Sequence, residues 1–196
     1  TLLWNTKHNK NRKGNSKTMK NHIFICFEGV DGSGKTTLAK LLAEDLHAQY
    51  YYSPPEILLS IRSQIQRYDL AVRFQYYLLG NFIASEEVKK MVKKTPVVVD
   101  RYVYSTLVFH LPMMSKEMSE ILLPDHIVHV TASWDTIEHR LSQRANRQKG
   151  EELPYLQAVA QQYERLFSGL NNVISIDTTS ETPLASLRRI KDRLRR

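Results

Sequence analysis

The segment FEGVDGSGKTT at Phe27–Thr37 constrains this chain most strongly, because it joins two stretches of different periodicity. An apolar run of strand length, Ile23–Phe27, precedes it, and leucines at helical spacing follow it over Lys35–His47. Within the segment, a glycine, four intervening residues and then Gly-Lys-Thr match the spacing of a phosphate-binding loop. The sequence therefore predicts a phosphate site between its first strand and its first helix.

Each residue type in this loop has a physical role. Glycines let backbone N–H groups approach phosphates closely, and the N-terminus of the following helix adds positive potential. We expect Lys35 to bridge the β- and γ-phosphates and the Thr36 hydroxyl to coordinate Mg²⁺, so ATP and Mg²⁺ are the predicted cofactors. The predicted cofactor-binding residues of the loop are Gly29, Asp31, Gly32, Ser33, Gly34, Lys35, Thr36 and Thr37.

A second feature is VVVDR at Val97–Arg101, an apolar strand that ends in an acid and a base. The carboxyl edge of a parallel sheet is where α/β proteins bind ligands, so Asp100 should emerge there and hold Mg²⁺ directly or through water. Arg101 can clamp a phosphate bidentately. A local ion pair is the alternative interpretation when this motif is taken alone.

Arginines recur in the polar turn that runs from Arg140 to Lys149. A solvent-exposed helix end is the simplest explanation for these arginines. However, γ-phosphoryl transfer needs cations around the transferred group, and the phosphate loop supplies only Lys35. We therefore predict a mobile lid that closes over ATP. In this hypothesis Arg140 contacts the cofactor, while Arg144 and Arg147 join Lys35 and Arg101 as catalytic residues.

The sequence shows no Ser/His/Asp constellation, no metal-binding Cys/His cluster and no dedicated base. A kinase that acts on a nucleoside monophosphate needs no base, because the second pKa of the acceptor phosphate is near 6 and the group is already mostly dianionic at pH 7. Catalysis then reduces to alignment and charge neutralisation.

Short β-rich runs alternate with helical patterns along the chain, which predicts right-handed βαβ units and a parallel sheet. The fold class is α/β, one domain with helices on both faces of the sheet. The predicted strands are His22–Phe27, Gln49–Ser53, Pro96–Asp100, His126–Thr131 and Val173–Asp177. The predicted helices are Lys35–His47, Glu56–Gln66, Asp69–Lys93, Val103–Leu111, Lys116–Leu122, Trp134–Arg144, Pro154–Phe167 and one from Pro183 to the end.

The 196 residues suffice for one domain with a substantial core. No apolar run approaches the ~20 residues that span a bilayer, so we expect no membrane association. Cys26 is the only cysteine, which excludes an internal disulfide and favours a reducing, cytoplasmic location.

The net charge of +8 is unevenly distributed, since residues 1–18 carry five Lys or Arg and no acid. We expect this segment to be a disordered basic tail or a remnant of expression, ahead of a single nucleotide kinase domain over 19–196. The basic cluster at Arg188–Arg196 is favourable at the C-terminal end of a helix dipole. Nucleic acid is therefore not the expected partner.

Four segments carry a family resemblance: FEGVDGSGKTT at Phe27–Thr37, VVVDRYVYST at Val97–Thr106, LLPDHIVHV at Leu122–Val130 and RLSQR at Arg140–Arg144. Their order and spacing resemble thymidylate kinases over about residues 21–196. The resemblance implies a P-loop kinase fold with a five-stranded parallel sheet, an arginine-bearing lid and commonly a homodimer. It also implies that Asp31 faces the acceptor sugar, that Arg101 holds the acceptor phosphate, and that Ser105 belongs to the substrate site.

The acceptor side departs from this family. The Arg-Glu-Pro-type segment after the second strand reads YYSPPE here, and Ala84 occupies the position of the base-contacting arginine. The SPP, LGNFIASE and VVVDRYVYST segments instead are similar to the thymidylate-kinase-like domain of mitochondrial UMP/CMP kinase. We therefore predict acceptor phosphate recognition by Arg62 or Arg73 and base contacts from Tyr77 or Asn81.

The leading hypothesis is ATP-dependent phosphorylation of dTMP to dTDP. Other pyrimidine monophosphates (dUMP, dCMP, CMP or UMP) are the first alternative. A deoxynucleoside kinase is the second, and it would need a carboxylate base, for which Glu28 at the end of the first strand is the candidate. A non-catalytic, NTP-dependent nucleic-acid-binding protein is the third.

Overall fold

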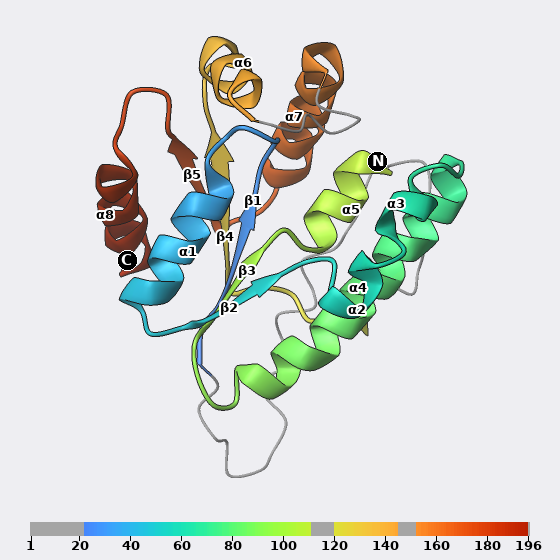
Figure 1. Ribbon diagram of the computed structural model, residues 1–196. Coiled ribbons are helices and arrows are strands. Elements are labelled where there is room, and N and C mark those ends of the chain that lie inside the picture. The colour runs from blue at the N-terminus through green and yellow to red at the C-terminus, as the bar shows by residue number, and fades with distance from the viewer. Residues whose placement is uncertain (1–21, 111–119, 145–151, 196) are drawn as a thin grey trace.

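The fold is built on a five-stranded sheet in which every pairing is parallel (Figure 1). The computed structural model describes residues 22–110, 120–144 and 152–195. The strand order is β2-β3-β1-β4-β5, which confirms the predicted architecture. The strands are β1 (Phe24–Glu28), β2 (Gln49–Tyr52), β3 (Val97–Asp100), β4 (His126–Thr131) and β5 (Val173–Asp177).

Helices cover both faces of the sheet because side chains of successive strand residues point to opposite sides. On one face, Ile25 and Phe27 pack with α1 and α8; on the other, Phe24 and Cys26 pack with α4, α5 and α7. The helices of the described residues are α1 (Lys35–Asp45), α2 (Glu56–Leu59), α3 (Arg62–Ile65), α4 (Leu70–Met91), α5 (Val103–Phe109), α6 (Trp134–Ser142), α7 (Leu153–Phe167) and α8 (Pro183–Leu194).

Local signals set several helix boundaries. The Ser133 side chain accepts a hydrogen bond from the Thr136 backbone N–H and caps α6 as predicted, and Asp69 caps α4 in the same way. The prediction of one helix over Glu56–Gln66 was wrong, because the structure breaks it into α2 and α3. The predicted short helix at 116–122 falls mostly outside the described residues, as does the basic segment 1–18.

The carboxyl ends of the strands meet at one edge of the sheet. Phe27 and Tyr52 both pair in register with Asp100, and Glu28 pairs with His129. The loop after β1 leads from this edge into α1, while α6 and α7 lie above the same edge (Figure 1). The topology thus brings the ends of β1 and β3 together with the loop that the sequence singled out.

Gly29 offers a direct test of how tightly the loop after β1 is packed. Its φ is +146°, and an added Cβ would lie 2.3 Å from the Val130 carbonyl oxygen. We expect Gly29→Ala to lower the free energy of unfolding by about 2–4 kcal/mol through strain and overpacking. Gly169→Ala is the control, since nothing lies within 4 Å of its Cβ position. Urea denaturation measures both, and equal losses would contradict this packing.

Candidate active site

The loop between β1 and α1 has the backbone conformation of a phosphate cradle. Gly32 and Gly34 have φ values of +83° and +92°, in the region that favours glycine. A Cβ at Gly32 would also lie 3.1 Å from Cγ2 of Ile137 and 3.2 Å from Cγ of Leu141, so α6 packs directly against the loop. The helix N-terminus at Lys35 follows at once, and its backbone N–H groups favour an anion there.

Lys35 is a buried cation at the start of α1. Its Nζ donates to the Val30 carbonyl at 3.2 Å and lies 3.5 Å from Oδ1 of Asp31. Burial and the Arg101 charge lower the pKa of Lys35 to about 8, while the Asp31 carboxylate opposes that shift. The amine therefore remains mostly protonated at pH 7 and is held within the loop.

Thr36 and Asp100, which are both predicted metal ligands, lie within hydrogen-bond distance of each other. The Thr36 hydroxyl donates to Oδ2 of Asp100 at 2.5 Å, and Tyr50 donates to the same oxygen at 3.1 Å. Asp100 is fully buried, and its Oδ1 has no hydrogen-bond partner among the described residues. A buried carboxylate oxygen beside a hydroxyl fits a hard cation such as Mg²⁺, which prefers oxygen ligands and keeps several waters.

Arg101 lies across the loop from Lys35 and contacts Asp31. Its Nη2 is 2.8 Å from Oδ1 of Asp31, and its Nη1 donates to the Ser105 hydroxyl at 3.1 Å. Burial alone would raise the pKa of Asp31, but the charges of Arg101 and Lys35 hold it well below its usual range. Asp31 is thus ionised and paired with both cations.

Glu28 is a fully buried carboxyl group beneath this site. Its two oxygens accept hydrogen bonds from the Tyr102 N–H at 2.9 Å, the Ser105 N–H at 3.2 Å, the Ser105 hydroxyl at 2.6 Å and the Tyr163 hydroxyl at 2.9 Å. The side chain is fully buried, and that burial raises the pKa of the carboxyl group. Glu28 therefore connects the end of β1 to the start of α5 and to Tyr163 of α7 by hydrogen bonds.

Arg140 links the loop after β1 to Thr178, the residue that follows β5. It donates to the Gly32 carbonyl at 3.1 Å and to the side chain and backbone oxygens of Thr178 at 3.0 and 2.9 Å. Thr178 in turn donates to the Ser33 carbonyl at 2.8 Å. No local motif marks Thr178 or Tyr50, because their side chains contact residues that are far away in the sequence.

The other predicted lid residues are placed only in part. Arg144 is exposed just after α6, and its charge reaches the Asp31 carboxylate. Arg147 lies outside the described residues. Thr37 is exposed in the first turn of α1.

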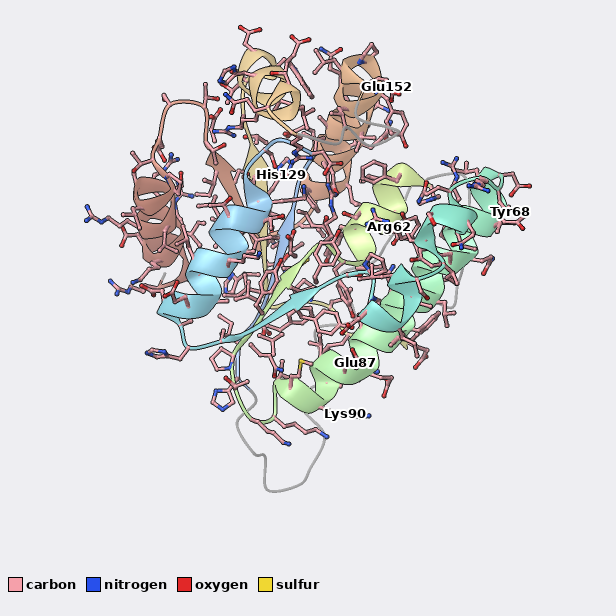
Figure 2. All side chains as sticks on the ribbon, in the orientation of Figure 1. Arg62, Tyr68, Glu87, Lys90, His129 and Glu152 are labelled. Atoms are coloured by element: carbon pink, nitrogen blue, oxygen red, sulfur yellow. The ribbon has the colours of Figure 1, made fainter. Side chains whose placement is uncertain are left out.

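Of the residues predicted to recognise the acceptor in place of the family's own contacts, Arg62 lies on α3 (Figure 2), and Arg73, Tyr77 and Asn81 lie on α4. Burial alone would lower the pKa of Arg62, but hydrogen bonds and charge from Tyr77 and Tyr52 raise it. The Nε of Arg73 is buried and has no hydrogen-bond partner among the described residues. Asn81 is 1% exposed, and its amide donates to the Thr106 hydroxyl at 2.8 Å, so it joins α4 to α5.

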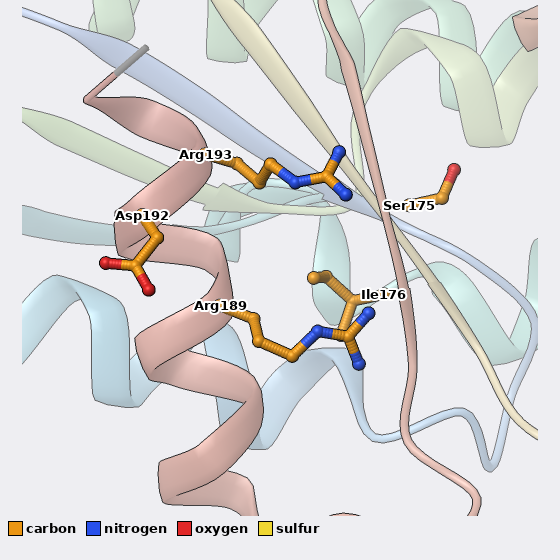
Figure 3. Close-up of a pocket in the computed structure, with 5 residues that line it drawn as sticks. All are labelled: Ser175, Ile176, Arg189, Asp192 and Arg193. Atoms are coloured by element: carbon orange, nitrogen blue, oxygen red, sulfur yellow. The ribbon is translucent and has the colours of Figure 1, made fainter.

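The basic end of the chain forms a separate surface. A cavity of about 180 Å³ lies between α8 and β5, lined by Ser175, Ile176, Arg189, Asp192 and Arg193 (Figure 3). Arg189 is paired with Glu181 at 2.6 Å, and Lys191 is paired with Asp45 at 2.6 Å. Two of the basic side chains of α8 are thus neutralised by neighbouring acids.

Two kinds of feature are absent from the described residues. None of their helices is both long and apolar enough to cross a membrane. They also contain no cluster of three or more His, Cys, Asp or Glu side chains arranged to hold a metal ion.

The parallel sheet with a glycine-rich phosphate loop after its central strand defines the class as the P-loop kinase fold. Residues 27–187 match the family model for thymidylate kinase, and the chain belongs to that family. A probable thymidylate kinase of Methanococcus vannielii is 31% identical over 180 residues, which cover 82% of this chain and 89% of the relative. The mitochondrial UMP-CMP kinase 2 of Homo sapiens is 34% identical over 73 residues, 37% of this chain and 16% of that protein.

Two solved structures share the fold. The thymidylate kinase of Candida albicans superposes with a TM-score of 0.72 at 15% identity, over 89% of this chain and 92% of the other. A deoxyadenosine kinase of M. mycoides gives a TM-score of 0.67 at 16% identity, over 88% of this chain and 99% of the other. At these identities the likeness concerns the fold alone.

Lys35 provides the test of the donor half of the site. We expect Lys35→Ala to lower kcat in an ADP-release assay with ATP and dTMP by at least ~100-fold, because it removes the charge that the loop supplies. Lys90→Ala, on the exposed side of α4, is the matched control and should keep full turnover. Thermal denaturation checks that both variants fold. Unchanged turnover in Lys35→Ala would refute the assigned site.

Proposed function

We propose that this chain transfers the γ-phosphoryl group of Mg·ATP to the 5′-phosphate of a pyrimidine nucleoside monophosphate, with dTMP as the first acceptor. The observation that supports this proposal is the pair of cations that share Asp31. Lys35 comes from the phosphate loop and Arg101 from the end of β3, and the same Asp31 oxygen lies 3.5 and 2.8 Å from them. We assign Lys35 to the donor phosphates and Arg101 to the acceptor phosphate.

The residues divide the work of the transfer. The loop N–H groups and Lys35 bind the donor phosphates, while Thr36 and Asp100 would hold Mg²⁺, which neutralises charge on the β- and γ-oxygens when bound. Arg101 binds the acceptor phosphate, whose dianion needs no base. Without nucleotides, Asp31 forms ion pairs with Arg101 and Lys35. When phosphates bind these two cations, Asp31 faces the acceptor sugar. We assign Arg144 and Arg147, of which only Arg144 lies within the described residues, to stabilising charge on the transferred group.

The surroundings of Glu28 favour a phosphate acceptor over a hydroxyl acceptor. A deoxynucleoside kinase would require a carboxylate oxygen within hydrogen-bond reach of the acceptor hydroxyl. Both oxygens of Glu28 instead accept hydrogen bonds from Ser105, Tyr102 and Tyr163, and the side chain is fully buried. Phosphorylation of a deoxynucleoside is therefore the second candidate function. The deoxyadenosine kinase of M. mycoides shares the fold of this chain.

Arg62 and Arg73 support a distinct mode of acceptor recognition. Arg62 is half-buried, and Tyr77 and Tyr52 raise its pKa, while the buried Nε of Arg73 has no hydrogen-bond partner among the described residues. A guanidinium group can bind a phosphate with two parallel hydrogen bonds. The Tyr77 ring packs at a tilt against His110, with ring centroids 5.4 Å apart, and offers an aromatic surface to the base. We assign Asn81 a supporting role for that surface, through its bond to Thr106.

A homodimer is the proposed assembly. Apolar side chains remain exposed along α2 and α4, with Ile57 75% and Leu79 50% exposed, and Val72 lies on the same helix as Leu79. Burial of such surface stabilises association. Sedimentation velocity on the full chain tests this assembly, and a monomer at micromolar concentration would contradict it. We place the enzyme in the cytoplasm, without a nucleic-acid partner.

An acceptor panel tests the reaction and the base preference together. ADP release is measured with dTMP, dUMP, dCMP, CMP and UMP at equal concentration. We expect turnover with pyrimidine monophosphates and the highest kcat/KM for dTMP. A higher kcat/KM for CMP or UMP would move the assignment to the alternative pyrimidine kinase, while turnover with none of them would contradict the proposed function.

Arg62 tests the acceptor side separately. We expect Arg62→Ala to raise the KM for the monophosphate at least ~10-fold and to leave the KM for ATP unchanged, because a charge-assisted hydrogen bond of about 1.5–3 kcal/mol is lost on one substrate only. Arg67→Ala, an exposed arginine after α3, is the matched control. Equal effects of the two substitutions would show that Arg62 does not bind the acceptor.

A further inference from the structure

Tyr50 reaches the predicted metal site from the neighbouring strand. It lies on β2, where Tyr52 pairs in register with Asp100 at the end of β3. The Tyr50 hydroxyl donates to Oδ2 of Asp100 at 3.1 Å, and its ring lies 5.7 Å from Nζ of Lys40 on α1. Tyr50 packs with the core on the α1 side of the sheet, the side from which Thr36 also approaches.

The two donors act on one oxygen and leave the other available. Thr36 and Tyr50 both donate to Oδ2 of Asp100, while Oδ1 has no partner among the described residues. A carboxylate held from two directions has a fixed plane, so its second oxygen points to one place. Leaving that oxygen unpaired in a buried site is costly unless a ligand satisfies it.

Tyr50 acts on Asp100 as a hydrogen-bond donor from a strand, because its hydroxyl lies 3.1 Å from Oδ2 and its backbone belongs to β2. Partners behind the ligands commonly determine how well a metal is held.

We propose that Tyr50 is a positioning residue for Mg²⁺: its hydroxyl holds the Asp100 carboxylate so that Oδ1 faces the cation. Tyr50 does not touch the metal or the nucleotide in this assignment and acts only through Asp100. The proposal rests on the proposed function only to the extent that the chain binds Mg·ATP.

The test measures the contribution of the metal to nucleotide affinity. Isothermal titration gives the Kd of the non-hydrolysable analogue AMPPNP for the full chain, once with Mg²⁺ and once with EDTA, and the ratio of the two constants isolates the metal. We expect Tyr50→Phe to reduce this ratio ~10-fold, at the low end of effects seen for such supporting residues, and to leave the Kd in EDTA unchanged.

Tyr51→Phe is the matched control, since Tyr51 lies on the same strand but donates to Glu87. It should leave the ratio as in the unaltered chain. Asp100→Asn should abolish the metal contribution, and Tyr50→Phe added to Asp100→Asn should have no further effect, because both substitutions act through one carboxylate. This non-additivity distinguishes positioning from a general loss of packing.

Three results would overturn the proposal: an unchanged ratio in Tyr50→Phe, an equal loss of affinity with Mg²⁺ and with EDTA, or an unchanged ratio in Asp100→Asn. The measurement needs no acceptor. A chain that shows the expected ratios but phosphorylates no monophosphate would contradict the proposed function and support the role of Tyr50.

Discussion

The rest of the site depends on the guanidinium group of Arg101, which joins the phosphate loop to α5. One side of it is paired with Asp31 in the phosphate loop, and the other donates to Ser105, whose hydroxyl donates to Glu28. Arg101 adopts a φ of 65°, which costs a non-glycine residue roughly 1–2 kcal/mol, and its N–H donates to the Phe27 carbonyl at 3.0 Å. With this backbone conformation, the Arg101 side chain points toward the loop after β1, where it contacts Asp31.

The charged groups of the site are paired with one another in the absence of nucleotide. Buried ions are tolerated only when they are paired and hydrogen-bonded. Lys35 and Arg101 share Asp31, while Glu28 is surrounded by donors from α5 and α7. In the proposed function, the phosphates would replace an anion that is already paired with these cations. Such preorganisation is the main way an enzyme stabilises charge in a phosphoryl transfer.

The fold was largely readable from the sequence, because it depends on local patterns. Apolar runs marked the five strands, and Ser133 marked the start of α6. The pairing of Thr36 with Asp100 followed from strand topology. Side-chain contacts between segments that are far apart in the chain could not be predicted from the sequence. Tyr50 and Thr178 belong to no motif, and their partners are set by which strands are neighbours and by how far each side chain reaches.

The central claim is that the acceptor is a phosphate and not a hydroxyl. The most direct measurement places the chain with γ-labelled ATP and equal concentrations of thymidine and dTMP in one tube, followed by separation of the products. We expect label in dTDP and none in dTMP, because we assign Arg101 to the acceptor phosphate and both oxygens of Glu28 already accept hydrogen bonds. Label in dTMP made from thymidine, without dTDP, would contradict it.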